Sequence, residues 1–430
     1  MVNPLVFVAL AVLAYALLSR RLASTIVTAP IFFAAAGFVA GPLLGVVDLA
    51  ADDELLILLL EAALVMVLFA DASGLEVGRW TKEPSLSGRL LGIGLPLTMV
   101  AGAASAAVIF GGVEPWQAAL VGVILAPTDA ALGQAVVANP RVPAVIRNAL
   151  NVESGLNDGL ALPFVTILVA VGLVAGGAET EVHAAETLLL ALGGSTLIGL
   201  LAGLGVGWLL ARSAERGLSS GRSQAVALVA LAVGTFVAAD QVEASGFLAV
   251  WVAGLATGTM VRGRVDEDAF HLPEEAAEVL AAISFLLLGA GLMGPILARA
   301  TPEMVAYAVL SLTVVRMAPV AIAMLRTGFA PATVVYVGWF GPRGLASIVF
   351  AGVVVEQAVP AASSITDVVL LTVVLSLVVH GVTAAWGARR YAAWFERAAA
   401  ADPAIPEAAE LAEGTTHYAG SSRRSVAHKV

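Results

Sequence analysis

Residues 116–138, WQAALVGVILAPTDAALGQAVVA, form an apolar stretch that Ala126-Pro127-Thr128-Asp129 interrupts near its middle. A second stretch, PATVVYVGWFGPRGLASIVFAGVV at 331–354, is interrupted in the same way by Gly341-Pro342-Arg343-Gly344. Proline removes a backbone donor and clashes with the preceding turn, so each motif is expected to break its helix. Paired breaks of this kind indicate two inverted repeats in a membrane, with a binding site near the bilayer midplane.

The composition supports a membrane protein. Hydrophobic residues make up 60% of the 430 and charged residues 13%, whereas soluble domains average roughly 45–50% and about 25%. Mean hydropathy is +0.95. The net charge of −10 lies largely in loops and tail, so it indicates neither an acidic substrate nor a nucleic-acid partner. Without cysteine, thiol nucleophiles and thiolate metal sites are excluded. Since no other nucleophile constellation or metal-ligand spacing occurs, we expect no enzyme and no cofactor.

Thirteen stretches approach the ~20 apolar residues that a spanning helix needs, so we predict an all-α membrane protein with thirteen transmembrane helices. Their approximate ranges are 3–19, 24–47, 54–71, 89–111, 116–138, 152–176, 186–211, 222–241, 245–261, 277–297, 304–325, 331–354 and 364–387. In the first stretch the charges Arg20 and Arg21 follow the apolar run, so it is interpreted as a spanning helix and not as a cleaved signal peptide.

The loop charges alternate between the two sides of the membrane. One set of loops carries Arg20, Arg21, Arg79, Lys82, Arg89, Arg141, Arg147, Arg212, Arg216, Arg222, Arg262, Arg264, Arg326, Arg389 and Arg390. The other set carries Arg299 as its basic residue, with Asp48, Asp52, Asp53, Glu54, Glu114, Glu179, Glu181, Glu243, Glu303 and Glu356. Basic residues favour cytoplasmic loops. We therefore expect the cell inner membrane, with the N-terminus outside and the C-terminus in the cytoplasm.

The breaks fall in helices 5 and 12, which divides the chain into six helices, a linker and six helices. We predict a first repeat over 1–176, linker helix 7 over 177–215 and an inverted second repeat over 216–390. Residues 391–430 are predicted to be a short cytoplasmic tail, polar and mobile from residue 398, with a regulatory tail as the alternative.

The densest polar cluster within a predicted span is NVESGLNDG at 151–159. On a helix Ser154 and Asp158 share a face, and so do Glu153 and Asn157. A charge inside a span is costly unless it is paired or hydrated, which makes it a functional candidate. Asp158 and Ser154 offer the hard oxygens that small cations select, and Asn157 adds an amide that cannot ionise. The alternative is a polar cluster that only packs helices or caps helix 6.

Further charged residues lie at the breaks and in helices 3 and 11. At the first break, unwound backbone next to Thr128 frees carbonyl groups for a cation, and Asp129 can neutralise half-helix N-termini. The alternative there is a proline kink with Asp129 as a simple cap. Arg316 and Arg343 stay charged and need partners, for which Glu153 and Asp129 are the candidates.

Three other polar residues lie within predicted spans. Asp71, towards the cytoplasmic end of helix 3, either lines an inward funnel or is an ordinary interfacial residue. Glu61 and His380 receive no role from the sequence.

At these residues the sequence resembles the cation/proton antiporters of the NhaP and eukaryotic sodium/proton exchanger branch. The matching pieces are Pro127-Thr128-Asp129-Ala130, Glu153 to Gly159, Ser245 to Gly254, and Gly341 to Gly344, with Arg316 as the helix-11 arginine. The resemblance covers roughly residues 5–390. It implies a homodimer, a mobile core made of helices 4–6 and 11–13, and a crossing of helices 5 and 12.

The resemblance also implies roles for individual residues. Asp158 would be the shared carrier of cation and proton, aided by the Thr128 carbonyl and the Ser154 hydroxyl. A Glu153–Arg316 pair and an Arg343 near Asp129 are implied as well. Asn157 stands where electrogenic relatives carry Asp, which implies electroneutral exchange. Asp71 stands where many relatives have Glu, which leaves the contribution of helix 3 open.

We therefore expect an antiporter that exchanges Na⁺ or Li⁺ for H⁺ by competition at the Asp158 carboxylate. A K⁺/H⁺ antiporter of the same fold is the closest alternative. A cation channel and a proton-coupled solute carrier are further alternatives. A channel would not need two broken helices around one site, and a solute carrier would need a larger polar cavity.

Overall fold

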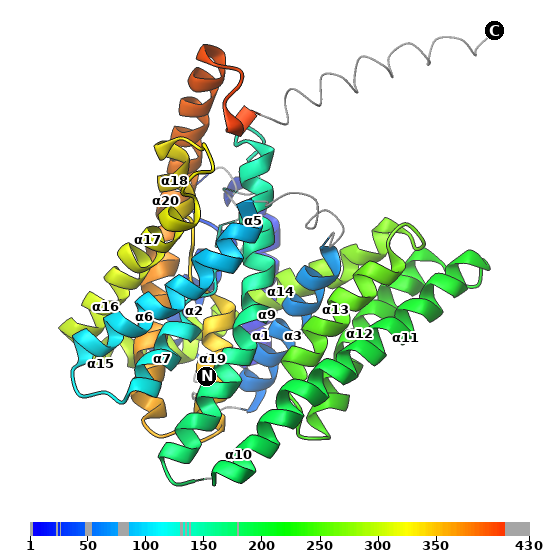
Figure 1. Ribbon diagram of the computed structural model, residues 1–430, viewed down its shortest axis with the longest axis horizontal. Coiled ribbons are helices and arrows are strands. Elements are labelled where there is room, and N and C mark those ends of the chain that lie inside the picture. The colour runs from blue at the N-terminus through cyan, green and yellow to red at the C-terminus, as the bar shows by residue number, and fades with distance from the viewer. Residues whose placement is uncertain are drawn as a thin grey trace.

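The computed structural model describes residues 3–22, 25, 27–47, 54–75, 86–129, 132–133, 136, 139–178 and 180–408, and within them the regular secondary structure is helical throughout. The first helices are α1 (Pro4–Leu22), α2 (Ala29–Phe38), α3 (Glu54–Gly74), α5 (Leu86–Arg89), α6 (Leu95–Phe110), α7 (Pro115–Ile124) and α9 (Ala144–Ala175) (Figure 1). The middle of the chain forms α10 (Glu181–Leu188), α11 (Ser195–Glu215), α12 (Gly221–Asp240), α13 (Gly246–Val261), α14 (His271–Leu287) and α15 (Met293–Arg299). The last helices are α16 (Pro302–Leu312), α17 (Val314–Ala323), α18 (Pro331–Trp339), α19 (Leu345–Glu356) and α20 (Ala362–Ala401).

Short π- or 3₁₀-helical turns extend or connect several helices. The π-turns are η1 (Val39–Leu43), η2 (Leu90–Gly94), η3 (Leu189–Gly194) and η5 (Leu288–Leu292), and the 3₁₀ turns are η4 (Glu267–Phe270) and η6 (Pro406–Ala408). Three of the π-turns join two helices into one continuous helical segment: η2 joins α5 to α6, η3 joins α10 to α11, and η5 joins α14 to α15.

The predicted all-α membrane fold is confirmed. Each of the thirteen predicted stretches contains helix, and nine helical segments of the described residues are long and apolar enough to cross a membrane. Four shorter apolar helices accompany them: Ala29–Leu43, Pro115–Ile124, Gly246–Val261 and Leu345–Glu356. The exact number of crossings stays a prediction. The orientation in the membrane also stays a prediction. Of the loop residues on which it was based, Asp48, Asp52, Asp53, Arg79, Lys82 and Glu179 lie outside the described residues.

Two predicted helices are longer than their apolar stretches. Helix 6 begins at Ala144 and spans 32 residues as α9, about 48 Å at 1.5 Å per residue. Helix 13 continues through Ala401 as α20, because a helix that leaves the apolar layer can continue among charged residues. The segment predicted as a mobile tail from residue 398 thus begins with the end of α20 and the η6 turn, and its mobility stays a prediction. Residues 409–430 lie outside the described residues.

The helices form two bundles (Figure 1). The crossing bundle contains α5–α7, α9 and α16–α20, in which α6 contacts α7, α16 and α17, and α20 contacts α16, α18 and α19. The outer bundle contains α1–α3 and α10–α14, in which α13 contacts α3, α11 and α12. The helices predicted as 4–6 and 11–13 thus pack together, as the family resemblance implies.

Small residues bring α11 and α13 into close contact. Gly199, Gly203 and Gly207 lie one turn apart on α11, and each faces α13. A β-carbon on Gly203 would lie 2.6 Å from the Ala253 carbonyl oxygen. Small residues at such positions let helix backbones approach closely, which is how packing and dispersion hold helices together in lipid.

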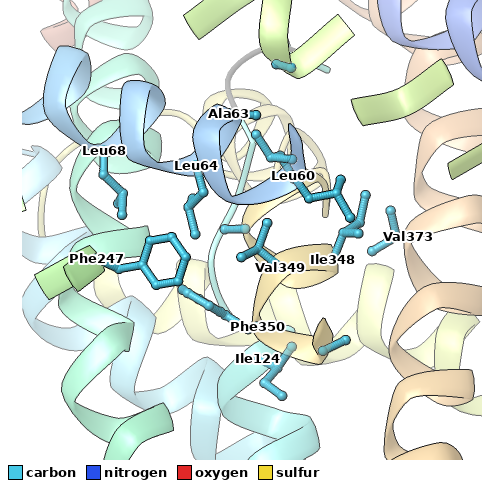
Figure 2. Close-up of a cluster of buried hydrophobic side chains, with 14 of the residues drawn as sticks. Leu60, Ala63, Leu64, Leu68, Ile124, Phe247, Ile348, Val349, Phe350 and Val373 are labelled. Atoms are coloured by element: carbon cyan, nitrogen blue, oxygen red, sulfur yellow. The ribbon is translucent and has the colours of Figure 1, made fainter. Parts of the chain in front are cut away.

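The two bundles meet across apolar side chains. Figure 2 shows the contact, formed by Leu60, Ala63, Leu64 and Leu68 of α3, Phe247 of α13, Ile124 of α7, Ile348, Val349 and Phe350 of α19, and Val373 of α20. Leu64 and Phe350 are almost fully buried. Because this contact is held by packing and not by hydrogen bonds, it imposes little directional restraint.

The glycine contact yields a stability prediction. Gly203→Ala should destabilise the protein by about 1–3 kcal/mol, because the new methyl group meets backbone that cannot rotate away. Gly205→Ala, two residues along the same helix, is the matched control, since nothing lies within 4 Å of its β-carbon position. Thermal unfolding midpoints in detergent would measure the difference. Equal midpoints would contradict the packing argument.

Candidate cation and proton site

Two unwound segments cross inside the crossing bundle. Helix α7 ends at Ile124 and α18 ends at Trp339, each shortly before its proline. The Asp129 amide nitrogen donates to the Pro342 carbonyl oxygen at 2.8 Å, which joins the two segments directly. Both predicted breaks are therefore present, and they contact one another.

The two breaks cap each other's helix ends. Asp129 Oδ2 accepts a hydrogen bond from the Leu345 amide, at the start of α19, at 2.9 Å. In the opposite direction, Arg343 Nη1 donates to the carbonyl oxygens of Ala126 at 2.9 Å and Pro127 at 3.1 Å, just beyond the end of α7. The Ser347 hydroxyl donates to Ile124 O at 2.8 Å. A carboxylate at a helix N-terminus and a guanidinium at a C-terminus each complement the helix dipole.

This arrangement corrects one expectation. Arg343 does not pair with Asp129; within the described residues it forms no ion pair, and its side chain is bound to backbone carbonyls. The physical reason is that helix ends buried in an apolar layer need partners as strongly as charges do. Gly344 makes the approach possible, because a β-carbon there would collide with the Asp129 carboxylate.

Three polar side chains gather where α9 faces the first break. The hydroxyls of Thr128 and Ser154 lie 3.2 Å apart, and Asn157 Nδ2 donates to Thr128 Oγ1 at 2.7 Å. Thr128 and Asn157 are nearly fully buried. Asn157 Oδ1 is buried and has no partner within the described part of the chain. The cluster thus presents hydroxyl oxygens and one unused amide oxygen.

Asp158 lies on α9, four residues after Ser154, and is 7% exposed. Across the described ranges its carboxylate has no hydrogen bond and no ion-pair partner. The charges of Asp129 and Asp71 act on it. Asp71 of α3 packs on α9, since its Cβ lies 3.1 Å from where a β-carbon on Gly155 would be. The site is therefore acidic, and it lies where the outer bundle meets the crossing bundle.

Glu153 and Arg316 form the expected pair. Arg316 Nη1 and Nη2 donate to the two Glu153 carboxylate oxygens at 2.5 and 2.8 Å, and each side chain is 1% exposed. Gly341 of the second break lies directly against the Arg316 guanidinium, where a β-carbon would not fit. The two charges of this pair thus neutralise each other next to the crossing, and Arg316 does not pair with Asp158.

The sequence assigned no role to His380, and it did not single out Ser376 or Trp251. The Arg343 amide donates to Ser376 Oγ at 2.7 Å, His380 Nδ1 lies 3.1 Å from the same hydroxyl, and His380 Nε2 lies 3.0 Å from Trp339 O. Both histidine nitrogens are thus used to hold the second break. The available signal was the four-residue spacing of Ser376 and His380 in an apolar helix. Trp251 of α13 covers Gly159, next to Asp158.

A sequence profile described as the transmembrane part of sodium/hydrogen exchangers matches residues 8–390. The chain belongs to the sodium/hydrogen exchanger family. This family consists of membrane transporters, so the exchanger assignment agrees with the apolar helices and makes the chain a multi-pass membrane protein.

Some of the similar sequences are named K(+)/H(+) antiporters and others Na(+)/H(+) exchangers. The chain is 25% identical over 339 residues to the K(+)/H(+) antiporter NhaP of Alkalimonas amylolytica, which covers 78% of this chain and 56% of that protein. It is 31% identical over 241 residues to an uncharacterized Na(+)/H(+) exchanger of Mycobacterium tuberculosis, covering 54% of this chain and 42% of the other. The chain spans about half the length of the curated relatives it matches.

A solved structure shares the exchanger fold. The sodium proton antiporter MjNhaP1 from Methanocaldococcus jannaschii superposes with a TM-score of 0.70 at 17% identity, over 90% of this chain and 98% of that one. At this identity the likeness establishes the fold.

The buried ion pair yields a coupling prediction. Glu153→Gln or Arg316→Ala should each cost roughly 3–5 kcal/mol, because each leaves one buried charge without its partner. The double change should cost less than the sum of the two. Thermal unfolding in detergent would measure the three variants. Glu396→Gln, which breaks an exposed pair with Arg141, is the control and should change little. Strictly additive losses would contradict the pairing.

Proposed function

We propose that this protein exchanges Na⁺ or Li⁺ for H⁺ across the membrane, with Asp158 as the shared carrier. The observation that carries the proposal is a buried carboxylate without a partner among the described residues, in a bundle whose other central charges are paired or bound to backbone. A buried charge of this kind is costly. Either a proton or a monovalent cation relieves that cost, and the two compete because each uses the same oxygens.

The neighbours of Asp158 suit a small, hard cation. Ser154 is on the same face of α9, and Thr128 lies within hydrogen-bond distance of Ser154. Hydroxyl, carboxylate and carbonyl oxygens are the ligands that such cations prefer. We propose Asp158, Ser154 and Thr128 as cation ligands, with Asn157 and Asp129 shaping the site and Asp71 facing it from α3.

The division into two bundles supports alternating access. We propose that the crossing bundle carries the site past the outer bundle, and that the apolar contact of Figure 2 permits the movement. A loaded or protonated Asp158 is neutral and can pass this contact. An empty, negative Asp158 is held back because the charge would enter apolar surroundings.

The architecture around this mechanism is part of the proposal. We propose inverted repeats over 1–176 and 216–390 joined by a linker at 177–215, supported by the matching breaks in α7 and α18. We also propose a homodimer in the cell inner membrane, with the N-terminus outside, supported by the loop charges.

K⁺/H⁺ exchange is the second candidate, because the NhaP relatives of Alkalimonas and Shewanella carry that name. Family membership favours both forms of antiport over a channel or a solute carrier. Proteoliposomes with an imposed pH gradient, given Na⁺, Li⁺ or K⁺ in turn, separate the two candidates.

Asp158→Asn should abolish exchange and leave the protein folded, because an amide cannot trade a proton for a cation and the change breaks no hydrogen bond among the described residues. The same proteoliposome assay measures it. Asp240→Asn, at the exposed end of α12, is the control and should transport like the wild type. Near wild-type exchange by the Asp158 variant would refute the carrier assignment.

Exchange should be electroneutral. Asn157 donates to Thr128 and cannot titrate, and Arg316 stays bound to Glu153, so one carboxylate carries one charge in each direction. Transport should not respond to a potassium–valinomycin potential, and solid-supported-membrane currents should be absent. Asn157→Asp adds a second titratable group and should make any remaining transport voltage-sensitive. Wild-type currents that scale with transport would contradict the one-carboxylate account.

A further inference from the structure

The end of the described chain folds back onto the crossing bundle. The exchanger profile ends at residue 390, but α20 continues to Ala401 and is followed by the η6 turn, Pro406–Ala408. Figure 1 shows α20 projecting at the top of the view, with η6 turned back beside it. The transporter match therefore gives this segment no role.

Glu407 anchors the returning segment. The residue is 3% exposed, and Oε1 accepts hydrogen bonds from the Ala330 amide at 2.9 Å and from Thr333 Oγ1 at 2.5 Å. Ala330 is the N-cap residue of α18, and Thr333 lies in its first turn. A carboxylate at this place satisfies a free backbone donor and complements the helix dipole. Glu407 thus caps α18 from 77 residues away in the sequence.

Neighbouring contacts fix the anchor in place. The Thr333 hydroxyl also lies 2.9 Å from the Tyr391 hydroxyl of α20, and the Tyr391 ring stacks on Tyr336 of α18 with centroids 4.0 Å apart. Pro406 packs on Gly328, 3.3 Å from the position of a β-carbon there. Glu407 Oε2 is buried without a partner in the described residues. Burying an unpartnered carboxylate oxygen is unfavourable, so the surrounding contacts must offset its cost.

The C-terminal end of α18 lies at the second break, next to the proposed transport site. The helix ends at Trp339, and Arg343 follows at the break and caps α7. Ser376 and His380 of α20 hold the break itself, while Glu407 holds the opposite end of α18. Both ends of this half-helix are therefore fixed by α20 and the segment that follows it.

We propose that residues 402–408 are a positioning element of the transport site and that Glu407 is its positioning residue. By capping α18, Glu407 keeps Arg343 seated on the end of α7, and thereby sets the geometry of Thr128 and Asp158. The inference rests on the proposed function, because it assigns Glu407 an effect on cation binding.

The test compares substitutions on the same extension. Glu407→Ala should raise the apparent KM for the transported cation roughly fivefold, the factor expected from the loss of about one helix cap. Glu407→Gln should restore most of the wild-type KM, because the amide oxygen still accepts from Ala330 and Thr333. Thr333→Val removes one of the two hydrogen bonds to Glu407, together with the contact to the Tyr391 hydroxyl, and should give a smaller rise because the bond from Ala330 remains. Glu396→Gln, which breaks the exposed pair with Arg141, should leave KM unchanged.

A purely structural role predicts a different result. It would lower the yield of folded protein and the maximal rate, but it would leave KM at the wild-type value in folded Glu407→Ala. That outcome overturns the proposal, and Thr333→Val with wild-type KM overturns it if the first variant does not fold.

Hydrogen–deuterium exchange separates this proposal from the proposed function. Glu407→Ala should speed amide exchange in residues 331–339, and Glu396→Gln should not. If the wild type fails to exchange cations for protons, the proposed function is wrong. Unchanged protection of 331–339 in Glu407→Ala overturns the positioning role in either case.

Discussion

The mutual capping of the two broken helices is the interaction on which the site depends. Two helices that stop inside an apolar layer leave amide and carbonyl groups without partners, which is strongly unfavourable where no water can replace them. Asp129 satisfies one end and Arg343 another, so each break supplies what the other lacks. With Arg316 bound to Glu153, these charges have partners inside the fold. Among the described residues Asp158 has no such partner, and this supports the proposal that it is a carrier and not a structural carboxylate.

The packing within the outer bundle differs from the packing between the two bundles. In the outer bundle, glycines of α11 bring two backbones into close contact, as small residues do between helices in lipid. Between the bundles, leucine and phenylalanine side chains of α3 and α19 meet without directed hydrogen bonds. The site lies along this boundary, where Asp71 of α3 meets α9. Specific bonds thus hold the site together from within its own bundle, while the contact with the other bundle stays largely apolar.

Much of this was predictable because its causes are local in the sequence. Pro127 and Pro342 mark the two breaks, each just after the end of its helix, and a four-residue spacing puts Ser154 and Asp158 on one face. Charge balance indicated that Arg316 needs a partner, and the family resemblance implied that this partner is Glu153. The partner of Arg343 was mispredicted, because the free carbonyl groups at a helix end cannot be read from residue types. A carboxylate can be, so Asp129 was chosen as the partner of the guanidinium. Glu407 was missed for a related reason: its partner is a backbone amide, and the residue itself is one carboxylate in a polar segment.

The crossing also has a consequence for biosynthesis. Asp129 and Leu345 are 216 residues apart, so at about 5–20 residues per second the ribosome needs on the order of 10–45 s to deliver the second partner. During that interval the residues of the first break have been synthesised, but their partners Arg343, Leu345 and Ser347 have not. The proposed cation site is therefore among the last parts of the chain to acquire its structure, and an error in a late helix disturbs a helix that was inserted long before.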